Sequence, residues 1–432
     1  MGIGLIFWAV SEPVTHFADP LHGGAAAGTT GAAQLATQYS FFHWLLHPWG
    51  IYAVVGLVMA YVNFRQDRPH LVSSVFYPLL GDRVNGPIGK VIDIIAVVAT
   101  LFGVAVSLGL GTLQIGAGFE ETFGIPNGIG LQLAIIGVTA AAYMISAFTP
   151  ISKGVNYLSQ ASIYVAGVLL VFFLVTGPTI TQINAFTQGI GDYLGEIVPM
   201  SFRLNSFDQD TAFMGKFTMF HFATWIAWAP FVGAFIARIS RGRTIREFVL
   251  GVLIAPSLVS GFWFAVFGGA AIDLDQSLGG TISSAASSDP AVGLFVFLQE
   301  YPLAVVTSLA TIFLLWIFFV AGADAGTIVL GSMSGGVNDP SATIKLLWGA
   351  VMAAFAAVLL MAGGGGIEAV QQASVLTVAP FAIIMVFMCW ALYKSLKADA
   401  RQVGLEEGEP QEEEAEGPAE KEPAGQQPAR SE

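Results

Sequence analysis

A stripe of tryptophans is the feature of this sequence that points most directly to chemistry. Trp225 and Trp228 lie three positions apart in TWIAWAPFVGAFIARISRGRTIRE, so on a helix they share one face, and Phe231 extends it. Pro230 removes a backbone hydrogen bond from the same segment, and Gly233 lets a neighbouring helix approach closely. Packing or an interface belt would also explain tryptophans, but these lie far from the Arg-rich end of the segment. We therefore favour a binding surface.

A second aromatic cluster lies in FFHWLLHPWGIYAVVGL, where Trp44, Trp49 and Tyr52 stand near one end of a predicted helix. Position alone is equally compatible with an aromatic belt at a membrane surface. Rings from two helices could instead enclose a fixed cation, because cation–π attraction holds a quaternary ammonium group at little desolvation cost. His43 and His47 have the i, i+4 spacing of helical metal sites, but no carboxylate or cysteine accompanies them in sequence. We therefore favour the cage over a metal site.

Small residues at the start and one deep acid are further candidates. Gly2 and Gly4 in MGIGL would let a helix unwind and free carbonyls for an ion and amides for a carboxylate, although simple helix packing also explains them. Asp324 is the one acid deep in an apolar stretch, where it serves function or caps a helix break. His221 has no acidic neighbour in sequence, and the lone Cys389 excludes a disulfide framework. Without a nucleophile–base pair or metal-ligand cluster in the spans, an enzyme is disfavoured.

The elements that carry these residues are membrane helices. Of 432 residues, 55% are hydrophobic and only 11% are charged, too few charges to cover a large soluble protein. The blocks 249–272 and 370–393 contain no charged residue, and each exceeds the roughly 20 residues needed to cross a hydrocarbon core. Neither alternates polar and apolar residues as a barrel strand would. The sequence therefore predicts an all-α integral membrane protein in contact with the lipid bilayer.

Hydropathy predicts about nine complete spans plus a half helix at the N-terminus. The complete spans are expected at 44–62, 91–118, 128–148, 155–178, 214–237, 248–272, 301–333, 343–363 and 374–393. A shorter helix, 181–197, has one apolar and one polar face, so we expect it to lie along the interface. Only about half a crossing precedes Ser11-Glu12-Pro13, and the loop 12–38 lacks Lys and Arg, so it is expected outside. We infer that residues preceding Met1 are missing from this sequence.

Charge sets the orientation. Lys and Arg occupy alternate loops, at 65–90, 153, 238–246, 345 and 394–401, and the other loops have almost none apart from Arg203 and Lys216. Positive-inside bias places the first set and the C-terminus in the cytoplasm, which predicts a multi-pass protein of the cell membrane. We divide the chain into a transmembrane domain, 1–397, and an acidic tail, 398–432, whose composition predicts disorder. The net charge of -13 excludes a basic nucleic-acid surface.

Four segments together resemble the betaine/carnitine/choline transporters: GIGLIFWAVSEP, HWLLHPWGIY, SLGLGTLQIGAGF and, most specifically, WIAWAPFVGAFIARISRGRTIREF. The resemblance covers the chain from Met1 to about Lys397. It implies a leucine-transporter-type core of two inverted repeats, in which this chain starts within the first core helix. It further implies a homotrimer and no cofactor other than a coupling ion.

The resemblance also implies roles for particular residues. It gives an aromatic box for the substrate, formed by Trp44, Trp49, Tyr52 and Trp225. Trp228 matches a position on the cytoplasmic side of the pathway, and Phe220 matches an external aromatic residue that closes over the substrate. Gly2 and Gly4 match a flexible glycine stretch whose first glycine would precede Met1.

Ion coupling is where the sequence departs from the family. Val104 and the pair Ala321-Gly322 stand where sodium-coupled members have hydroxyl side chains, and hard cations prefer oxygen ligands. Val232 stands where sodium-independent exchangers have Met. The acidic tail also differs from the basic C-terminal helix of osmosensing members.

Three coupling modes stay open. A sodium site could still form from Met1, Thr100 and Phe231 with backbone oxygens. Proton coupling through Asp324 and substrate exchange without an ion are the alternatives, and weak or absent sodium dependence is the expectation.

The sequence thus predicts a secondary active transporter for a small zwitterion or cation of the glycine betaine, choline or carnitine type, serving osmoprotection. An amino-acid or ectoine-type carrier on the same scaffold is the alternative. A channel or substrate-gated sensor is disfavoured, because no ring of charge or repeated filter sequence is present.

Overall fold

The computed structural model describes residues 2–21, 24–148, 152–204, 213–337, 339–364 and 368–402, and the regular structure in these ranges is helical. The helices are α1 (Gly2–Ala18), α2 (Thr30–Trp44), α3 (Leu46–Arg65), α4 (Tyr77–Leu80), α5 (Pro87–Phe123), α6 (Ile129–Phe148), α7 (Ser152–Thr176), α8 (Thr179–Gly195), α9 (Ile197–Ser201), α10 (Phe220–Ile239), α11 (Ile245–Ser277), α12 (Thr281–Ser288), α13 (Pro290–Gln299), α14 (Ala304–Gly335), α15 (Ala342–Ala362) and α16 (Glu368–Gln402). Short 3₁₀ turns at Ser73–Phe76 and Gly81–Asn85 flank α4, and a π-helical turn at Met214–Met219 leads into α10.

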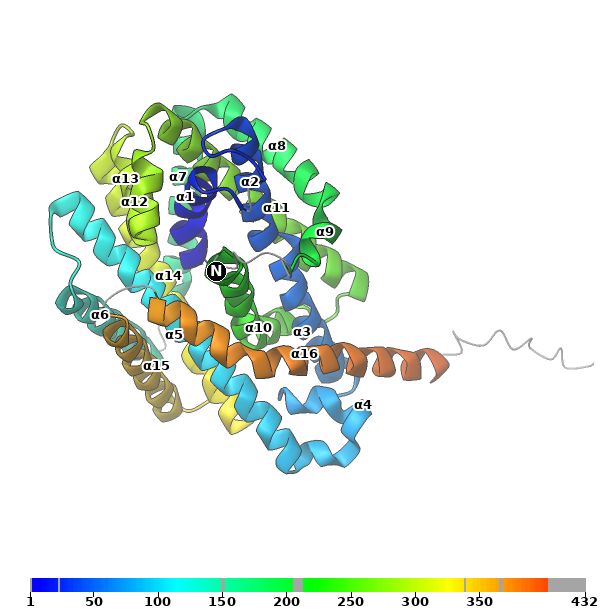
Figure 1. Cartoon of the computed structure of the whole chain (residues 1–432). Coiled ribbons are helices and arrows are strands. Elements are labelled where there is room, and N and C mark those ends of the chain that lie inside the picture. Colours follow the sequence, from blue (N-terminus) through cyan, green and yellow to red (C-terminus); the bar gives the residue numbers. More distant parts are fainter. Residues whose placement is uncertain are drawn as a thin grey trace, which may run out of the picture.

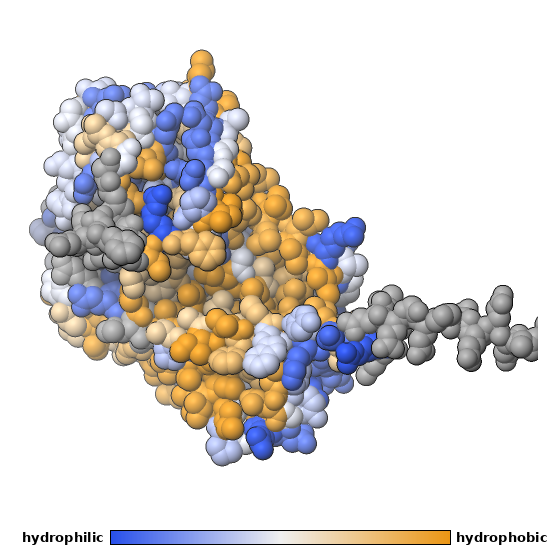
Figure 2. Space-filling view, turned by 45° about the vertical axis from the view of Figure 1, so that its right-hand side comes forward, coloured by the Kyte–Doolittle hydropathy of each residue, from blue (hydrophilic) through white to orange (hydrophobic). Residues whose placement is uncertain are grey.

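Eight spans in the described ranges are long and apolar enough to cross a membrane, or nine if the bent pair α7–α8 is one span. This confirms the predicted all-α membrane class. The described parts of α7 and α8 meet at 111°, which agrees with the expectation that the shorter helix lies along the interface. Figure 2 shows an apolar band between hydrophilic edges, as lipid contact requires. Ile163 and Val168 of α7 are 71% and 68% exposed, so this helix presents apolar side chains outward.

The first helix is longer than predicted. The sequence suggested that the helix ends before Glu12, but α1 continues through Pro13 to Ala18. Space for the Pro13 ring comes from Gly268 of α11, where an added Cβ would lie 2.7 Å from Pro13 Cγ. The polar residues beyond the proline are buried and not part of an external loop: the Thr15 hydroxyl donates to the Ser11 carbonyl at 2.6 Å.

The first complete span also starts earlier than predicted. A single 36-residue span covers Thr30–Arg65, where the expectation was 44–62, and it is interrupted only at Leu45 between α2 and α3. The Thr29 side chain caps its start by accepting from Ala32 N–H. Pro48 has no N–H to donate to the preceding turn, so the break falls where the helical hydrogen-bond ladder is weakest. The many small and polar residues of α2 lower its mean hydropathy, so hydropathy did not predict this extension.

Two packing contacts position the central helices. α10 packs most extensively against α3, and α1 packs most extensively against α11, with α2, α12 and α13 also in contact. Figure 1 shows α1 and α10 near the middle of the bundle, with α2 and α3 beside them. Gly233 confirms the expected close approach, because a Cβ there would lie 2.6 Å from Val55 Cγ1 and 3.0 Å from the Gly56 nitrogen.

The C-terminal helix passes the predicted domain boundary. α16 runs to Gln402, so the division between 397 and 398 falls inside a helix. Its last turns contact α3, where Asp399 accepts hydrogen bonds from Arg65 Nε at 2.9 Å and from the Tyr61 hydroxyl at 2.5 Å. The rest of the predicted tail, 403–432, lies outside the described residues.

Candidate functional site

Three of the four predicted box residues meet in the middle of the bundle. The rings of Trp44 and Trp225 lie 4.9 Å apart, nearly perpendicular at 86°, and the Tyr52 ring lies 6.1 Å from Trp225. All three side chains are buried. Half-buried Trp49 joins through Tyr52, at 5.6 Å. The helices α2, α3 and α10 thus bring together residues far apart in sequence, and we call Trp44, Trp49, Tyr52 and Trp225 the aromatic cage.

Hydrogen bonds fix the two central tryptophans of the aromatic cage. Trp225 Nε1 donates to the His43 carbonyl at 2.9 Å, close to the helix break at Leu45. Trp44 Nε1 donates to Glu12 Oε2 at 2.7 Å. A buried indole N–H normally needs such a partner, so these bonds determine how the rings face one another.

The other predicted aromatic positions lie around the cage. Trp228 points toward α5, where its Nε1 donates to the Ser107 hydroxyl at 3.0 Å, and its ring lies 5.0 Å from Phe231. Phe220 packs against Trp8 of α1, at 5.9 Å. Sequence reasoning missed Trp8, as it missed Phe264 of α11, whose ring lies 5.0 Å from Trp44.

The two predicted glycines differ in their surroundings. The helix α1 is regular from Gly2 onward, so the anticipated unwinding is not present in this conformation. A Cβ at Gly4 would lie 2.9 Å from Trp44 Cη2, which places Gly4 directly against the aromatic cage. A Cβ at Gly2 would lie 2.5 Å from Phe318 Cδ2, so Gly2 serves close packing with α14. Met1 lies outside the described residues.

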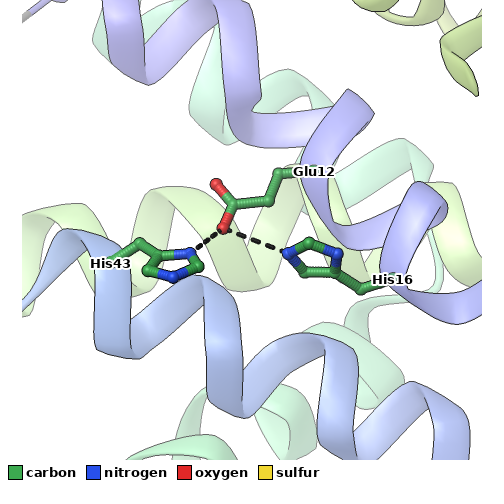
Figure 3. Close-up of side chains that lie close together, drawn as sticks. All are labelled: Glu12, His16 and His43. Atoms are coloured by element: carbon green, nitrogen blue, oxygen red, sulfur yellow. Dashed lines mark hydrogen bonds and ion pairs between the residues drawn. The ribbon is translucent and has the colours of Figure 1, made fainter. Parts of the chain in front are cut away.

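A buried carboxylate with three histidines is the part of this region that the sequence did not reveal, and Figure 3 shows Glu12 with two of them, His16 and His43. Glu12 Oε1 lies 2.6 Å from His43 Nδ1 and 3.4 Å from His16 Nε2, and Glu12 Oε2 lies 3.4 Å from His221 Nε2. These side chains are at most 3% exposed. We call Glu12, His16, His43 and His221 the Glu12 site.

The Glu12 site corrects two sequence arguments. His43 was judged to lack a carboxylate and His221 to lack an acidic neighbour, but Glu12 reaches both from α1. Glu12 is distant from His43 and His221 in sequence, and the predicted external loop at 12–38 placed it outside the membrane. His47 is not in the site, since its ring lies 2.8 Å from both the Tyr193 and Ser201 hydroxyl groups. The Glu12–His16 spacing of i, i+4 was the one signal that could have found half of the site.

Two of the positions considered for a sodium site contact sulfur and carbon atoms. The buried Thr100 hydroxyl has Met333 Sδ as a partner at 3.9 Å. Val104 faces Gly326 of α14, where a Cβ would lie 3.5 Å from Val104 Cγ1 and 3.1 Å from Met352 Sδ of α15. Carbon and sulfur atoms are poor ligands for a hard cation, so Val104 and Met352 offer sodium no side-chain oxygen.

Asp324 belongs to another part of the bundle. This half-buried residue lies on α14, and its carboxylate is hydrogen-bonded to the side chain of Ser146 from α6. Its backbone carbonyl accepts from the Thr327 hydroxyl at 2.7 Å. The helices that carry Asp324 and Ser146 are not those that carry the aromatic cage.

The many apolar helices and the buried aromatic cage are features expected of a membrane transporter. Residues 1–401 match the family model described as betaine/carnitine/choline family transporter. The chain belongs to this family of transporters.

Curated relatives agree with the family assignment. The chain is 45% identical over 405 residues to the glycine betaine transporter OpuD of Bacillus subtilis, covering 93% of this chain and 78% of the relative. It is 42% identical over 401 residues to a probable glycine betaine transporter of Desulfitobacterium hafniense, covering 92% and 80%. It is 41% identical over 388 residues to an ectoine/hydroxyectoine transporter of Virgibacillus pantothenticus, covering 90% and 76%.

Proposed function

We propose that this chain is a secondary active transporter that carries glycine betaine, or a closely similar quaternary-ammonium compatible solute, across the cell membrane. The observation that carries the proposal is the convergence of Trp44, Tyr52 and Trp225 from three helices. Electron-rich ring faces attract a fixed positive charge that cannot donate hydrogen bonds. The relatives that transport glycine betaine support the same substrate class.

Two hydrogen-bond donors beside the rings favour a zwitterion over a simple cation. Trp49 Nε1 and the Tyr52 hydroxyl are buried without a hydrogen-bond partner among the described residues. Buried donors of this kind lose free energy unless a ligand supplies an acceptor. Glycine betaine has two carboxylate oxygens that can accept from both donors, whereas choline has a single hydroxyl oxygen, so betaine would satisfy the two donors better than choline.

The two central rings of the aromatic cage contact each other in this conformation. Trp44 and Trp225 meet edge to face at 4.9 Å, so no ammonium group lies between them. A cation held by a ring lies against its face, within about 6 Å of the centroid. We propose that the rings shift to admit the substrate as the transporter alternates between states.

Coupling to a steep sodium gradient is not favoured by the residues at the α5–α14 contact. Val104, Gly326 and Met352 meet there, and none of their side chains offers oxygen. We propose weak or absent sodium dependence, with transport coupled to protons through Asp324 or proceeding by exchange. The C-terminus would face the cytoplasm, on the side of the Arg-rich loops, and the working form would be a homotrimer, as the family resemblance implies.

Uptake by the protein reconstituted in liposomes tests the proposal. Labelled glycine betaine should be accumulated and should be displaced more strongly by excess unlabelled betaine than by choline or ectoine. The assay is repeated in sodium, in potassium and with a proton gradient. Preference for ectoine would favour the alternative that the Virgibacillus relative suggests. Failure to take up any betaine, or steep sodium-driven accumulation, would refute the substrate or the coupling proposal respectively.

A further inference from the structure

The Glu12 site lies where α1, α2 and α10 meet. The aromatic cage shares two hydrogen bonds with its residues, from Trp44 Nε1 to Glu12 and from Trp225 Nε1 to the His43 carbonyl. The donor atoms of the Glu12 site come from one carboxylate and three imidazole rings. Oxygen and nitrogen atoms of Glu12, His16 and His43 all lie within 4.8 Å of one another. Such a concentration of buried ligating groups is costly unless something balances it.

The hydrogen-bond pattern leaves the site short of a positive charge. His221 Nδ1 lies 2.8 Å from the Phe217 carbonyl, which can only accept, so this nitrogen carries the hydrogen. In the neutral ring, Nε2 then has a lone pair directed toward Glu12 Oε2 at 3.4 Å, where two acceptors face each other. His221 Nε2 has no hydrogen-bond partner among the described residues. A cation held by Glu12 beside these atoms would offset the repulsion.

His16 shows the same deficiency. Both of its ring nitrogens are buried and without a hydrogen bond in the described part of the chain. Its Nε2 lies 3.4 Å from Glu12 Oε1, on the opposite side of the carboxylate from His43 (Figure 3). A ring used only for packing gains nothing from two unsatisfied polar atoms, whereas a metal ligand needs a free nitrogen.

The donor set and the spacing suit a divalent transition metal. Imidazole nitrogen and carboxylate oxygen are ligands that zinc and its neighbours prefer. Bonds near 2.0–2.1 Å around a tetrahedral ion place ligand atoms about 3.3 Å apart. The distance of 3.4 Å from His16 Nε2 to Glu12 Oε1 already matches, and His43 Nδ1, now 2.6 Å from the same oxygen, would withdraw by about 0.7 Å.

A further group orients the His43 ring as metal ligands usually are oriented. His43 Nε2 lies 3.0 Å from the Thr218 hydroxyl, which leaves Nδ1 for the ion. His221 stacks in parallel on His43 and is fixed through Nδ1 by the Phe217 carbonyl, so it supports this ring from α10. Bonds of this kind set the tautomer and the ring orientation of ligating histidines.

We propose that Glu12, His16 and His43 of the Glu12 site bind a divalent transition metal ion of the zinc class, and that the bound ion ties α1 to α2 and slows transport. These two helices also carry Gly4 and Trp44, so fixing them restricts the movement of the Trp44 ring in the cage. A proton shared between Glu12 and the imidazoles is the competing occupant.

Zinc binding to the purified full chain tests this proposal. The protein is stripped with a chelator, and labelled zinc is added during betaine exchange, so that the closed site can open. We expect a single zinc ion per chain, and His16→Phe should weaken its binding by more than about tenfold. Among the described residues, the ring contacts of His16 include none of the three cage tryptophans, and phenylalanine keeps its contacts with Phe213 and Phe217. His47→Phe is the matched control, because it removes a histidine of the same region that lies outside the site.

Transport gives the second readout. Zinc should inhibit betaine uptake by the parent and by His47→Phe, and should lose this effect in His16→Phe. Should His16→Phe fail to fold, His16→Gln removes the same ligand and is expected to behave in the same way. Equal zinc affinity in parent and variant, or no binding to folded protein, overturns the proposal. Uptake that follows pH while zinc neither binds nor inhibits would assign the site to a proton.

Discussion

The Trp225→Leu variant separates cation binding from simple apolar burial. Leucine fills part of the space next to Trp44 and Tyr52 and keeps the site apolar, but it has no π face. The change removes ring contacts at 4.9 Å and 6.1 Å, together with the hydrogen bond from Nε1 to the His43 carbonyl. The lost hydrogen bond is between neutral groups and affects the bundle more than the ligand.

The magnitude follows from the desolvated cation. A cation–π contact in a buried site is worth about 2 kcal/mol, and about 1.4 kcal/mol corresponds to a tenfold change in Kd. We therefore expect Trp225→Leu to weaken glycine betaine binding by about thirtyfold. Trp225→Phe keeps a weaker π face and should fall between leucine and the parent.

An isostere without the positive charge makes the test specific. In 3,3-dimethylbutanoate a carbon atom replaces the ammonium nitrogen of betaine, so the shape and the carboxylate are kept and the positive charge is lost. Its weak binding should change by less than about threefold in Trp225→Leu, because no cation–π energy is at stake. Both ligands are measured by competition against labelled betaine on purified protein, with gel filtration to confirm folding.

The control replaces a tryptophan on the lipid-facing side. Trp390 of α16 is 54% exposed and lies beside Phe387, so Trp390→Leu should bind betaine like the parent. If Trp225→Leu also binds betaine like the parent, or loses affinity equally for betaine and for 3,3-dimethylbutanoate, the cage does not act through cation–π attraction.

Two glycine substitutions test the packing that positions the cage. Gly4→Ala places a methyl group 2.9 Å from Trp44 Cη2 and should weaken betaine binding by about tenfold. Gly50 has open space around it, so Gly50→Ala should bind betaine like the parent. Equal betaine affinity of the two variants would show that the Trp44 ring moves aside without loss of binding free energy. Gly233→Ala forces a methyl group against the backbone of α3 and should destabilise the bundle by about 1–3 kcal/mol, seen as a lower Tm. Gly137 is exposed and has open space around it, so Gly137→Ala is the control and should raise Tm slightly through helix propensity. A Gly233→Ala protein with the same Tm as Gly137→Ala would contradict the close α3–α10 contact.

The cage could be predicted because its signal is local. The distance along the chain from Trp225 to the Arg-rich loop is enough to place this residue deep in a long apolar segment. Trp44 and Tyr52 lie close together in one stretch of sequence. Hydropathy also located the spans, since lipid demands apolar side chains over a fixed length. The sequence near each ring does not determine which rings face each other. Trp228 lies on the same helical face as Trp225, yet its Nε1 donates to the Ser107 hydroxyl of α5 and not to a cage residue.

The Glu12 site could not be predicted because its signal is distributed over three helices. Pro13 argues for a helix end, and only the space at Gly268 of α11 lets α1 continue through it. With Glu12 assigned to an external loop, neither His43 nor His221 had a visible partner. A buried acid is tolerated here because Trp44 N–H and the imidazoles surround it, an arrangement that only packing creates.

Glu12 and His43 each take part in both the cage and the histidine cluster, which constrains how the two sites behave. One Glu12 oxygen holds Trp44 while the other meets His43, and the His43 carbonyl holds Trp225. Movement of the Glu12 carboxylate toward a cation therefore pulls on the indole of Trp44, and separation of the rings for substrate pulls on Glu12. Any ion that binds the closed arrangement better must oppose loading, and by linkage bound substrate must weaken that ion by the same factor. Substitution of Glu12 itself would disturb both sites together, so His16, which bonds to neither tryptophan, is the position at which they can be separated.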